Sequence, residues 1–546
     1  MREVDRLTTE KYGIPSILLM ENAAHAVARV ITEKLGGSVK GKSILILCGP
    51  GNNGADGAAL ARILWTQGGQ PYVFTIGSRE NLKDDAGTNF EILSHFNGYF
   101  AITSLTRENL LDQFQKVSDQ RPDAIVDAVF GTGLNRPLSV EYSSLLELVR
   151  DYTFDTKTTP VFAIDIPSGL NSDGTEPTTC PLKADVTITF TAPKPALVLP
   201  PTCHLCGELI TAPIGTPGDL VASYPSQLFV TTDSDLGLWC YDSRFTDSSY
   251  KNKRGHALLI AGSESYSGAA VLAGNAAMRS GVGLVTIATP RSSKDSVASR
   301  VLPEVMVRGV AETENGAIAE SAFEEIKDLL EKADAVAIGS GISQDESTKK
   351  FVQKVIERRR QPMVVDADAL NLLSPFGKQC ASPRVSKGDT SNASVSRLLT
   401  RGLVHQPLIL TPHEGEFMRL LGTDDKDAIK DRVAAVRDFA VKHNVILVLK
   451  GERVLIGEPG GKVVVNPTGN SGLGKAGNGD TLTGILAGFV AQAVQFNIDI
   501  FETVVAAVYI AGIAGDIAEK KYGKRVMTAS DVRESLTDAF NQLEAN

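Results

Sequence analysis

The chain has 546 residues, of which 42% are hydrophobic and 22% are charged, and its net charge is −9. This length exceeds one ordinary core and predicts two to four domains of a globular protein. A chain without a basic excess is not expected to bind nucleic acid, whose partners carry basic faces.

Neither the cysteines nor the apolar runs indicate a secreted or membrane protein. The first residues, Met1 to Arg6, lack an apolar signal segment, and we expect no run to be long enough to span a bilayer. Six cysteines do not suggest a disulfide framework in a chain this long. Cys203 and Cys206 have CxxC spacing, but no second pair completes a zinc site. We therefore expect a cytoplasmic protein with reduced thiols.

The first half alternates helical patterns with short buried strands. Apolar residues recur at helical spacing between Ile17 and Ile31, which predicts a helix within the first forty residues. Strands rich in Val and Ile without strict alternation are typical of a parallel sheet covered on both faces, which makes this an α/β domain. The predicted strands are 43–48, 71–76, 124–130, 161–165 and 185–190.

A second α/β domain follows a passage rich in proline between Pro193 and Pro225. We place the domain boundary there, giving domains 1–225 and 226–546. The segment 233–253 is polar and weakly patterned, and 374–406 is interpreted as an exposed insertion rich in Ser, Lys and Arg. The predicted strands of the second domain are 257–261, 284–288, 335–338, 363–366, 408–411 and 445–449.

A glycine-rich loop follows the first predicted strand. Its sequence, Gly49-Pro-Gly-Asn-Asn-Gly-Ala-Asp56-Gly57, matches GxGxxG, but a helix precedes the strand and the next strand ends without an acidic residue. A phosphate or nucleotide site is therefore favoured over the dinucleotide site of a dehydrogenase. The alternative is a tight turn that needs glycine for purely structural reasons.

Two further strand ends carry polar residues. Asp127 lies in a strand that ends at Gly131, and Asp165 ends another strand that leads to Ser168. Because ligands gather at the carboxyl ends of parallel strands, we expect these segments to share one crevice with the glycine-rich loop. Asn53, Asp127 and Ser168 would supply hard oxygen ligands, which suit a hard cation.

The motifs Leu19-Met-Glu-Asn-Ala23, Gly49–Gly57, Asp127–Leu134 and Asp165–Asn171 resemble those of the NAD(P)HX epimerase family, over essentially all of residues 1–220. The resemblance implies a Rossmann-like three-layer αβα sandwich that epimerises the hydrated nicotinamide of NADHX and NADPHX. It also implies a potassium ion held by Asn53, Asp127 and Ser168, with Asp165 as the acid or base. The implied substrate contacts are Asn52, Asn53, Gly54, Ala55, Asp56, Gly131, Thr132, Gly133, Leu134, Asn135, Arg136, Pro137 and Asp165.

A second glycine-rich loop, Lys475-Ala-Gly-Asn-Gly-Asp480, precedes an apolar helix over 481–489. A helix N-terminus presents unpaired N–H groups and can cradle an anion. Asp480 would repel phosphate and is better suited to act as the base for a hydroxyl that is phosphorylated. The alternative is an aspartate that only caps a core helix. His413, Asp366 and Lys450 also follow predicted strands.

These segments, together with 262–269, 279–285, Thr411–His413 and Asn466–Asn470, resemble the ADP- or ATP-dependent NAD(P)HX dehydratases, which have a ribokinase-like fold. The resemblance runs from about 226 to 546. It implies phosphorylation of the hydrate hydroxyl and then elimination of phosphate, with Mg²⁺ and ADP or ATP as cofactors. The implied substrate contacts are Ala269, Gly341, His413 and Asp480. The implied nucleotide contacts are Lys450, Gly451, Glu452, Arg453, Val454 and Gly479.

Four positions depart from these families. Ala55 and Asn478 stand where a glycine and a serine are usual, Ser340 interrupts a Gly-Pro-Gly, and Glu414 replaces a proline after His413. Glu414 would place a negative charge near a site for anionic substrates. None of the four removes a proposed acid or base.

The leading hypothesis is a bifunctional metabolite-repair enzyme, an isomerase and a lyase, which we expect to form a homo-oligomer. One alternative is a ribokinase-type kinase of a small alcohol fused to a nucleotide-binding module. Another is that the N-terminal half binds nucleotide but has lost catalysis, against which the intact Asn53, Asp127, Asp165 and Ser168 argue.

Overall fold

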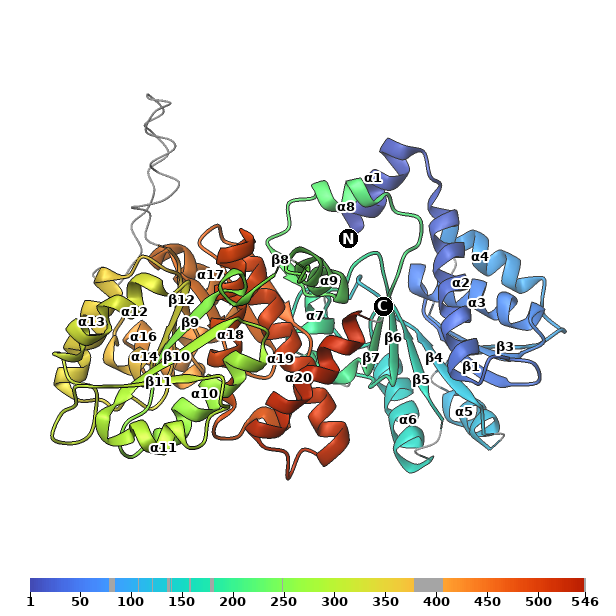
Figure 1. Cartoon of the computed structure of the whole chain (residues 1–546). Coiled ribbons are helices and arrows are strands. Elements are labelled where there is room, and N and C mark those ends of the chain that lie inside the picture. The colour runs from blue at the N-terminus through green and yellow to red at the C-terminus, as the bar shows by residue number, and fades with distance from the viewer. Residues whose placement is uncertain are drawn as a thin grey trace. The chain divides into compact units, whose positions relative to one another are not determined.

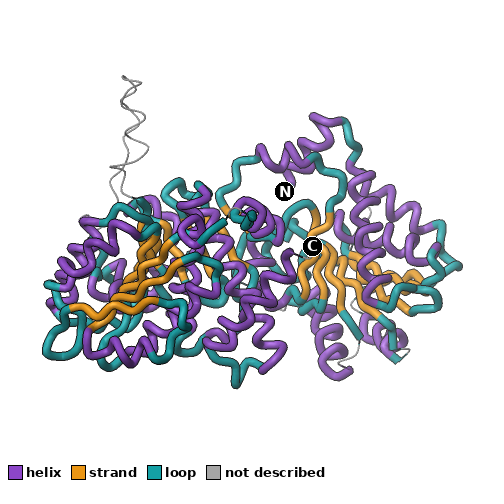
Figure 2. The backbone as a smooth tube through the Cα atoms, in the orientation of Figure 1, coloured by secondary structure: helices purple, strands orange, loops and turns teal. Residues whose placement is uncertain are grey.

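The computed structural model describes residues 1–77, 84–106, 108–119, 121–134, 138, 140–156, 159–176, 181–247, 249–377 and 406–544. It divides into two compact units, unit 1 (Met1–Pro225) and unit 2 (Ser226–Asn546). In each unit, a layer of strands lies between layers of helices (Figure 1, Figure 2).

Unit 1 contains a parallel sheet of seven strands in the order β3-β2-β1-β4-β5-β6-β7. Alternate residues of β1 face two cores, with Ile44 and Ile46 on one side and Leu45 and Leu47 on the other. Its strands are β1 (Ser43–Cys48), β2 (Gln70–Ile76), β3 (Ala101–Leu105), β4 (Ala124–Ala128), β5 (Val161–Ile164), β6 (Val186–Phe190) and β7 (Glu208–Ala212).

Helices cover both faces of this sheet, because each face is apolar and needs a partner. The helices α2 (Ser16–Lys34), α3 (Asn52–Thr66) and α4 (Asp85–Ser94) pack on one face, and α5 (Leu110–Ser118) and α6 (Val140–Thr156) pack on the other. Smaller elements are α1 (Arg2–Tyr12), α7 (Pro195–Val198), the 3-10 helix η1 (Thr202–Leu205) and α8 (Gly218–Ser223).

Unit 2 contains a sheet of ten strands in the order β11-β10-β9-β12-β13-β14-β15-β16-β17-β8. It is parallel from β11 to β15, and β16 then pairs antiparallel with both β15 and β17. The strands are β8 (Leu228–Val230), β9 (His256–Ile260), β10 (Leu284–Pro290), β11 (Met306–Val310), β12 (Ala335–Ile338), β13 (Met363–Val365), β14 (Leu408–Leu410), β15 (Ile446–Leu449), β16 (Val454–Gly457) and β17 (Val463–Asn466).

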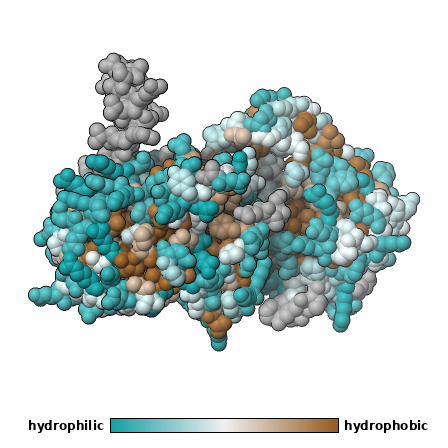
Figure 3. All heavy atoms as spheres, in the orientation of Figure 1, coloured by the Kyte–Doolittle hydropathy of each residue, from teal (hydrophilic) through white to brown (hydrophobic). Residues whose placement is uncertain are grey.

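One large apolar core joins a face of this sheet to α9 (Asp233–Asp242), α10 (Ser267–Arg279), α18 (Asn478–Phe496), α19 (Ile500–Tyr522) and α20 (Ala529–Glu544). The other helices are α11 (Lys294–Ala298), α12 (Ala322–Lys332), α13 (Glu346–Arg358), α14 (Asp368–Leu372), α16 (Glu414–Leu421) and α17 (Arg432–His443). The 3-10 helices are η2 (Lys251–Arg254), η3 (Arg291–Ser293), η4 (Lys426–Ile429) and η5 (Ser471–Leu473). On the face seen in Figure 3, unit 2 is mostly hydrophilic, with hydrophobic residues showing around β9, β10 and α10.

The structure corrects three sequence predictions. One helix, α19, is long and apolar enough to cross a membrane, although no such run was expected, and 67% of its apolar window is buried within the protein, as in a core helix. The proline-rich passage contains β7, and the segment interpreted as polar and unpatterned contains α9. Strands β3, β8, β11, β16 and β17 were also missed. Of the predicted insertion, residues 378–405 lie outside the described part of the chain.

Candidate functional site

In unit 1 the polar residues gather where the strand order reverses. The chain builds β2 and β3 on one side of β1 and then places β4 on the other, so the strand order reverses at the carboxyl ends of β1 and β4. Parallel sheets commonly bind ligands at such a reversal. The glycine-rich loop follows β1, and Gly131 follows β4, so these segments lie at the edge where the sequence predicted a shared crevice.

Two glycines of the loop are required by close backbone packing. A Cβ atom at Gly49 would lie 2.0 Å from the carbonyl oxygen of Val129, and one at Gly54 would lie 1.9 Å from the carbonyl oxygen of Gly49. Contacts this short exclude any larger residue. Close packing of the backbone therefore explains why Gly49 and Gly54 are glycines. Ala55, by contrast, fits into a fully buried position of α3.

Asn53, Gly131 and Asp165 converge on one point. A Cβ atom at Gly131 would lie 3.1 Å from Asn53 Oδ1 and 3.2 Å from Asp165 Oδ2. Gly131 thus leaves a small space between an amide oxygen and a carboxylate oxygen. Asn53 is 8% exposed, and its Nδ2 is buried without a hydrogen bond to the described residues. An unsatisfied buried donor of this kind is costly unless a ligand accepts from it.

Asp127 and Ser168 form a buried pair beneath this point. The Ser168 hydroxyl donates to Asp127 Oδ1 at 2.6 Å, and the Ser168 backbone N–H donates to Oδ2 at 2.7 Å. The backbone N–H of Phe130 donates to the Ser168 hydroxyl at 2.9 Å. Burial raises the pKa of Asp127, and the hydrogen bonds from Ser168 oppose that rise.

Asp165 is held in a strained backbone position by a buried lysine. Its φ of 66° lies in the left-handed region, which a non-glycine residue rarely adopts. Lys194 Nζ donates to Asp165 Oδ1 at 2.6 Å, and Thr189 Oγ1 donates to the same oxygen at 3.1 Å. Oδ2 accepts no hydrogen bond from the described residues. One carboxylate oxygen is therefore anchored and the other faces Gly131.

Asp56 is the second carboxylate of the crevice. It is 8% exposed, and its Oδ1 is buried without a hydrogen bond to the described residues. Burial raises the pKa of Asp56 well above its usual range, and the charges of Asp165 and Asp5 raise it further. Asp5 belongs to α1, so the first helix of the chain also contributes charge to this site.

The remaining residues assigned to this site are only partly placed. Asn52 is exposed at the start of α3, Thr132 is half-buried, Gly133 is exposed and Leu134 is buried. Asn135, Arg136 and Pro137 lie outside the described residues. Lys194 and Asp5 were missed. Lys194 follows β6 at the same sheet edge, so a search of every strand end would have found it, whereas nothing in the local sequence marks Asp5.

The site of unit 2 also lies at a reversal of strand order, between β9 and β12. The backbone N–H of Gly262, after β9, donates to the carbonyl oxygen of Ser340, after β12, at 2.8 Å. Gly341 has a φ of 65°, and a Cβ atom there would lie 2.9 Å from the Cβ of Ala269. Gly341 and Ala269, both assigned to the hydrated cofactor, are thus neighbours.

Asp480 lies in the first turn of α18, where the helix dipole favours a negative charge. Burial raises the pKa of Asp480, and the charges of Asp366 and Asp368 raise it further, while Lys450 lowers it. The Ser340 hydroxyl also lowers this pKa, although it makes no regular hydrogen bond to the described residues. A carboxyl group in this setting is suited to accept a proton.

Asp366 and Lys450 form a buried ion pair beside Asp480. Lys450 Nζ lies 2.7 Å from Asp366 Oδ1, and Thr483 Oγ1 donates to Asp366 Oδ2 at 2.8 Å. A Cβ atom at Gly479 would lie 3.6 Å from both Asp366 Oδ2 and Lys450 Nζ. Lys450 and Gly479, both assigned to the nucleotide, are thus close together. Asp366 and Thr483 were absent from the predicted site, although Asp366 follows a predicted strand.

His413 caps the start of α16. Its Nδ1 accepts hydrogen bonds from the backbone N–H groups of Gly415 at 3.0 Å and Glu416 at 3.3 Å. Its side chain is 57% exposed, and its Nε2 lies 3.5 Å from Glu416 Oε1. The capping role accounts for Nδ1, and Glu416 is the neighbour of Nε2 within the protein.

The loop from Lys450 to Val454 leads into β16. Gly451 packs against the guanidinium of Arg432, which a Cβ atom at Gly451 would approach to 2.5 Å at Nη2. Arg453 Nη1 donates to the carbonyl oxygen of Pro467. Glu414, which replaces the usual proline, lies 3.4 Å from Arg432 Nε, so its negative charge is partly balanced. Arg432 was missed by the sequence, in which it lies 18 residues before Lys450.

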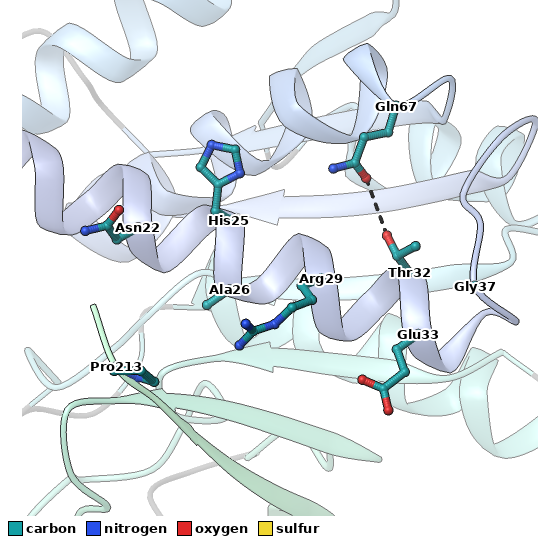
Figure 4. A pocket seen from close by; sticks show the side chains of 9 residues that line it. All are labelled: Asn22, His25, Ala26, Arg29, Thr32, Glu33, Gly37, Gln67 and Pro213. Carbon is teal, nitrogen blue, oxygen red and sulfur yellow. Dashed lines mark hydrogen bonds between the residues drawn. The ribbon is translucent and has the colours of Figure 1, made fainter. Parts of the chain in front are cut away.

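A separate surface pocket of about 760 Å³ lies along α2 (Figure 4). Its lining includes His25, Arg29 and Glu33, and Thr32 donates to Gln67 Oε1 at 3.4 Å. None of the site residues described above lines it. Cys203 and Cys206 are buried around η1 and form no disulfide, and the described residues contain no group of three His, Cys, Asp or Glu that could hold a metal.

Comparison with known proteins matches both units. Residues 16–196 match the family described as "YjeF-related protein N-terminus", and residues 257–386 and 393–538 match "NAD(P)H-hydrate dehydratase". The bifunctional NAD(P)H-hydrate repair enzyme Nnr of Moorella thermoacetica is 36% identical over 100% of this chain and 96% of its own length. The Nnr enzyme of Thermofilum pendens is 32% identical over 99% and 95%.

Among solved structures, the ADP/ATP-dependent NAD(P)H-hydrate dehydratase of Bacillus subtilis, co-crystallised with ATP and Mg²⁺, is 29% identical. It covers 58% of this chain and 100% of its own, with a TM-score of 0.47. The predicted fold, a Rossmann-like sandwich followed by a ribokinase-like α/β domain, is confirmed.

Proposed function

The chain belongs to the family of bifunctional NAD(P)H-hydrate repair enzymes, and we propose that its two units divide the two activities. Unit 1, residues 1–225, interconverts the R and S epimers of NADHX and NADPHX. Unit 2, residues 226–546, dehydrates the S epimer to NADH or NADPH at the expense of ADP or ATP. The observation that carries this division is that each unit builds its own carboxylate site at its own reversal of strand order.

In unit 1 we assign proton transfer to Asp165 and Asp56. Lys194 and Thr189 anchor Oδ1 of Asp165 and leave Oδ2 to act as a base. The raised pKa of Asp56 lets it hold a proton and act as the acid. Epimerisation at one carbon requires a proton to be taken and returned, and two carboxyl groups in one crevice can do both. The substrate would contact Asn52–Asp56, Gly131–Pro137 and Asp165.

We assign a potassium ion to Asn53, Asp127 and Ser168. The buried Asp127 carboxylate and the adjacent Ser168 hydroxyl offer oxygen ligands, and the burial that raises the pKa of Asp127 disfavours its charge unless a cation compensates it. Such an ion would supply positive charge for a phosphate-bearing substrate. Replacing K⁺ by choline should lower the melting temperature of the wild-type protein. If replacing K⁺ by choline lowered the melting temperature of Asp127→Asn by the same amount, the assignment would be wrong.

In unit 2 we assign Asp480 as the base that accepts the hydroxyl proton of the hydrate. The oxygen of that hydroxyl takes the terminal phosphoryl group of ADP or ATP, and AMP or ADP leaves. Phosphate is then eliminated together with a proton from the neighbouring ring carbon, and the double bond forms between the two carbons. Ala269, Gly341 and His413 would contact the substrate, and Lys450–Val454 and Gly479 the nucleotide. Mg²⁺ bound together with the nucleotide would neutralise the charge of its phosphates.

We test this function by incubating the protein with NADHX and ADP or ATP. Repair predicts that the absorbance of NADH returns and that inorganic phosphate is released. A stable phosphorylated product without NADH would instead support a ribokinase-type kinase. We place the reaction in the cytoplasm and propose a homo-oligomer, which sedimentation of the full chain would test.

A further inference from the structure

Arg432 is a buried arginine at the edge of the unit 2 site. It is the first residue of α17, and Asp431 caps that helix by accepting from the backbone N–H of Ala434 at 2.9 Å. Helix α17 leads into β15, so the start of the helix lies at the same edge of the sheet as the end of the strand. Lys450 and Gly451 follow that strand end.

The guanidinium lies directly against Gly451. A Cβ atom at Gly451 would be 2.5 Å from Arg432 Nη2 and 3.5 Å from its Cζ. Any residue with a side chain would therefore push the arginine away. Gly451 thus leaves room for the guanidinium of Arg432 against the backbone of this loop.

The hydrogen-bonding capacity of Arg432 is not met within the protein. The side chain is 19% exposed, and its Nε and Nη2 are buried without a hydrogen bond to any described residue. Glu414, 55% exposed, comes within 3.4 Å of Nε but forms no hydrogen bond. Burial lowers the pKa of Arg432, while Glu414 and Glu452 raise it. Buried donors without acceptors cost free energy, which an anionic ligand with oxygen acceptors would recover.

We propose that Arg432 binds the phosphate groups of the adenine nucleotide in unit 2. The planar fork of a guanidinium matches two oxygens of a phosphate, and the guanidinium lies against Gly451, within the loop assigned to the nucleotide. Glu414 holds the guanidinium in place before nucleotide binds. This inference rests on the proposed dehydratase function, which requires a nucleotide in unit 2.

The test is a calorimetric titration of Mg–ADP into the full chain. Arg432→Met should raise the Kd by about tenfold to a hundredfold, because charge-assisted hydrogen bonds to phosphate are lost. Arg437→Met is the matched control, since this half-buried arginine of the same helix donates to the carbonyl oxygen of Gly461 at 3.0 Å. The control should change the Kd by less than about twofold. An unchanged Kd for Arg432→Met would overturn the inference.

Two more variants guard against a trivial loss of folding. Arg432→Lys keeps the charge without the fork and should bind Mg–ADP with intermediate affinity. Glu414→Gln should bind it at least as tightly as wild type, because the guanidinium is released to the phosphate. If Glu414→Gln lost as much affinity for Mg–ADP as Arg432→Met, the Glu414–Arg432 pair would have a purely structural role. That result would overturn the inference. Failure of the wild-type chain to bind Mg–ADP would contradict the proposed function itself.

Discussion

Both units pair a lysine with an aspartate and leave a second aspartate with a raised pKa. In unit 1, Lys194 pairs with Asp165 and the pKa of Asp56 is raised by burial. In unit 2, Lys450 pairs with Asp366 and the pKa of Asp480 is raised by burial. Each site thus uses one lysine and two aspartates, in unrelated sequence contexts.

The difference lies in the oxygens of the paired aspartate. Asp366 uses both, one toward Lys450 and one toward Thr483, so only Asp480 remains for proton transfer. Asp165 uses only Oδ1, and its Oδ2 faces the crevice beside Asn53. Unit 1 therefore offers an acid and a base, as epimerisation needs, and unit 2 offers one base, as phosphorylation of a hydroxyl needs.

The largest effect is expected for Asp480→Asn, which removes the proposed base of unit 2. Dehydration should fall about 10²- to 10⁴-fold, measured as the return of NADH absorbance from the S epimer with ADP. The exchange of R and S epimers should keep its wild-type rate. A parallel loss of exchange would mean that the two sites are not independent.

Asp165→Asn should produce the reverse pattern. Exchange of the epimers, followed by chromatography, should slow about 10²- to 10⁴-fold, and dehydration of pure S epimer should be unchanged. If a correctly folded Asp165→Asn protein exchanged the epimers at the wild-type rate, Asp165 would not be the base and Asp56 would have to take that role. The proposed difference between the two units would then be wrong.

Lys194→Met should destabilise unit 1 by about 3–5 kcal/mol, because it leaves the buried Asp165 carboxylate without its cation. Unit 1 can be followed in a Trp239→Phe background by urea unfolding monitored at Trp65, since the chain has 2 tryptophans. Lys34→Met is the control, because its partner Glu208 is exposed, and it should leave the urea midpoint close to that of the parent. Equal losses would show that the Asp165 pair is not buried as described.

Asp56→Asn should stabilise unit 1 increasingly as the pH rises. A carboxyl group whose folded pKa is raised favours folding at low pH and loses that contribution as the pH passes through the folded pKa. The asparagine cannot ionise, so its advantage over wild type should grow as the pH rises from the unfolded-state pKa to the raised folded pKa and stay constant above it. Melting temperatures between pH 5 and pH 9, chosen as an ordinary range for proteins, provide the measurement. A constant difference across the range would contradict the assigned pKa direction.

The smallest effect is expected for Ser340→Ala. Its hydroxyl lowers the pKa of Asp480, so the variant should move the acidic limb of the dehydratase pH profile upward while leaving the plateau rate unchanged. Thr348→Ala serves as a control, because its hydroxyl donates to the carbonyl oxygen of Ile318 at 2.8 Å. If the acidic limb did not shift, the Ser340 hydroxyl would have no effect on the pKa of Asp480.

The sequence predicted the central strands and the residues at their ends, because buried parallel strands are continuous apolar runs and their carboxyl ends share one edge. It missed the outer strands β3 and β11, whose burial is incomplete and whose apolar pattern is correspondingly weak. It also missed Lys194 and Arg432. Their importance depends on which oxygen or glycine each side chain meets, and such contacts join residues far apart in the chain.

Complementation between the two aspartate variants tests the division of labour most directly. Pure R epimer with ADP is given to Asp165→Asn alone, to Asp480→Asn alone, and to an equal mixture of the two. Asp165→Asn alone should return NADH no faster than its residual epimerisation allows, and Asp480→Asn alone no faster than its residual dehydration allows. The mixture should approach the wild-type rate because each protein performs one step. A mixture no faster than the single variants would contradict two independent active sites in the two units.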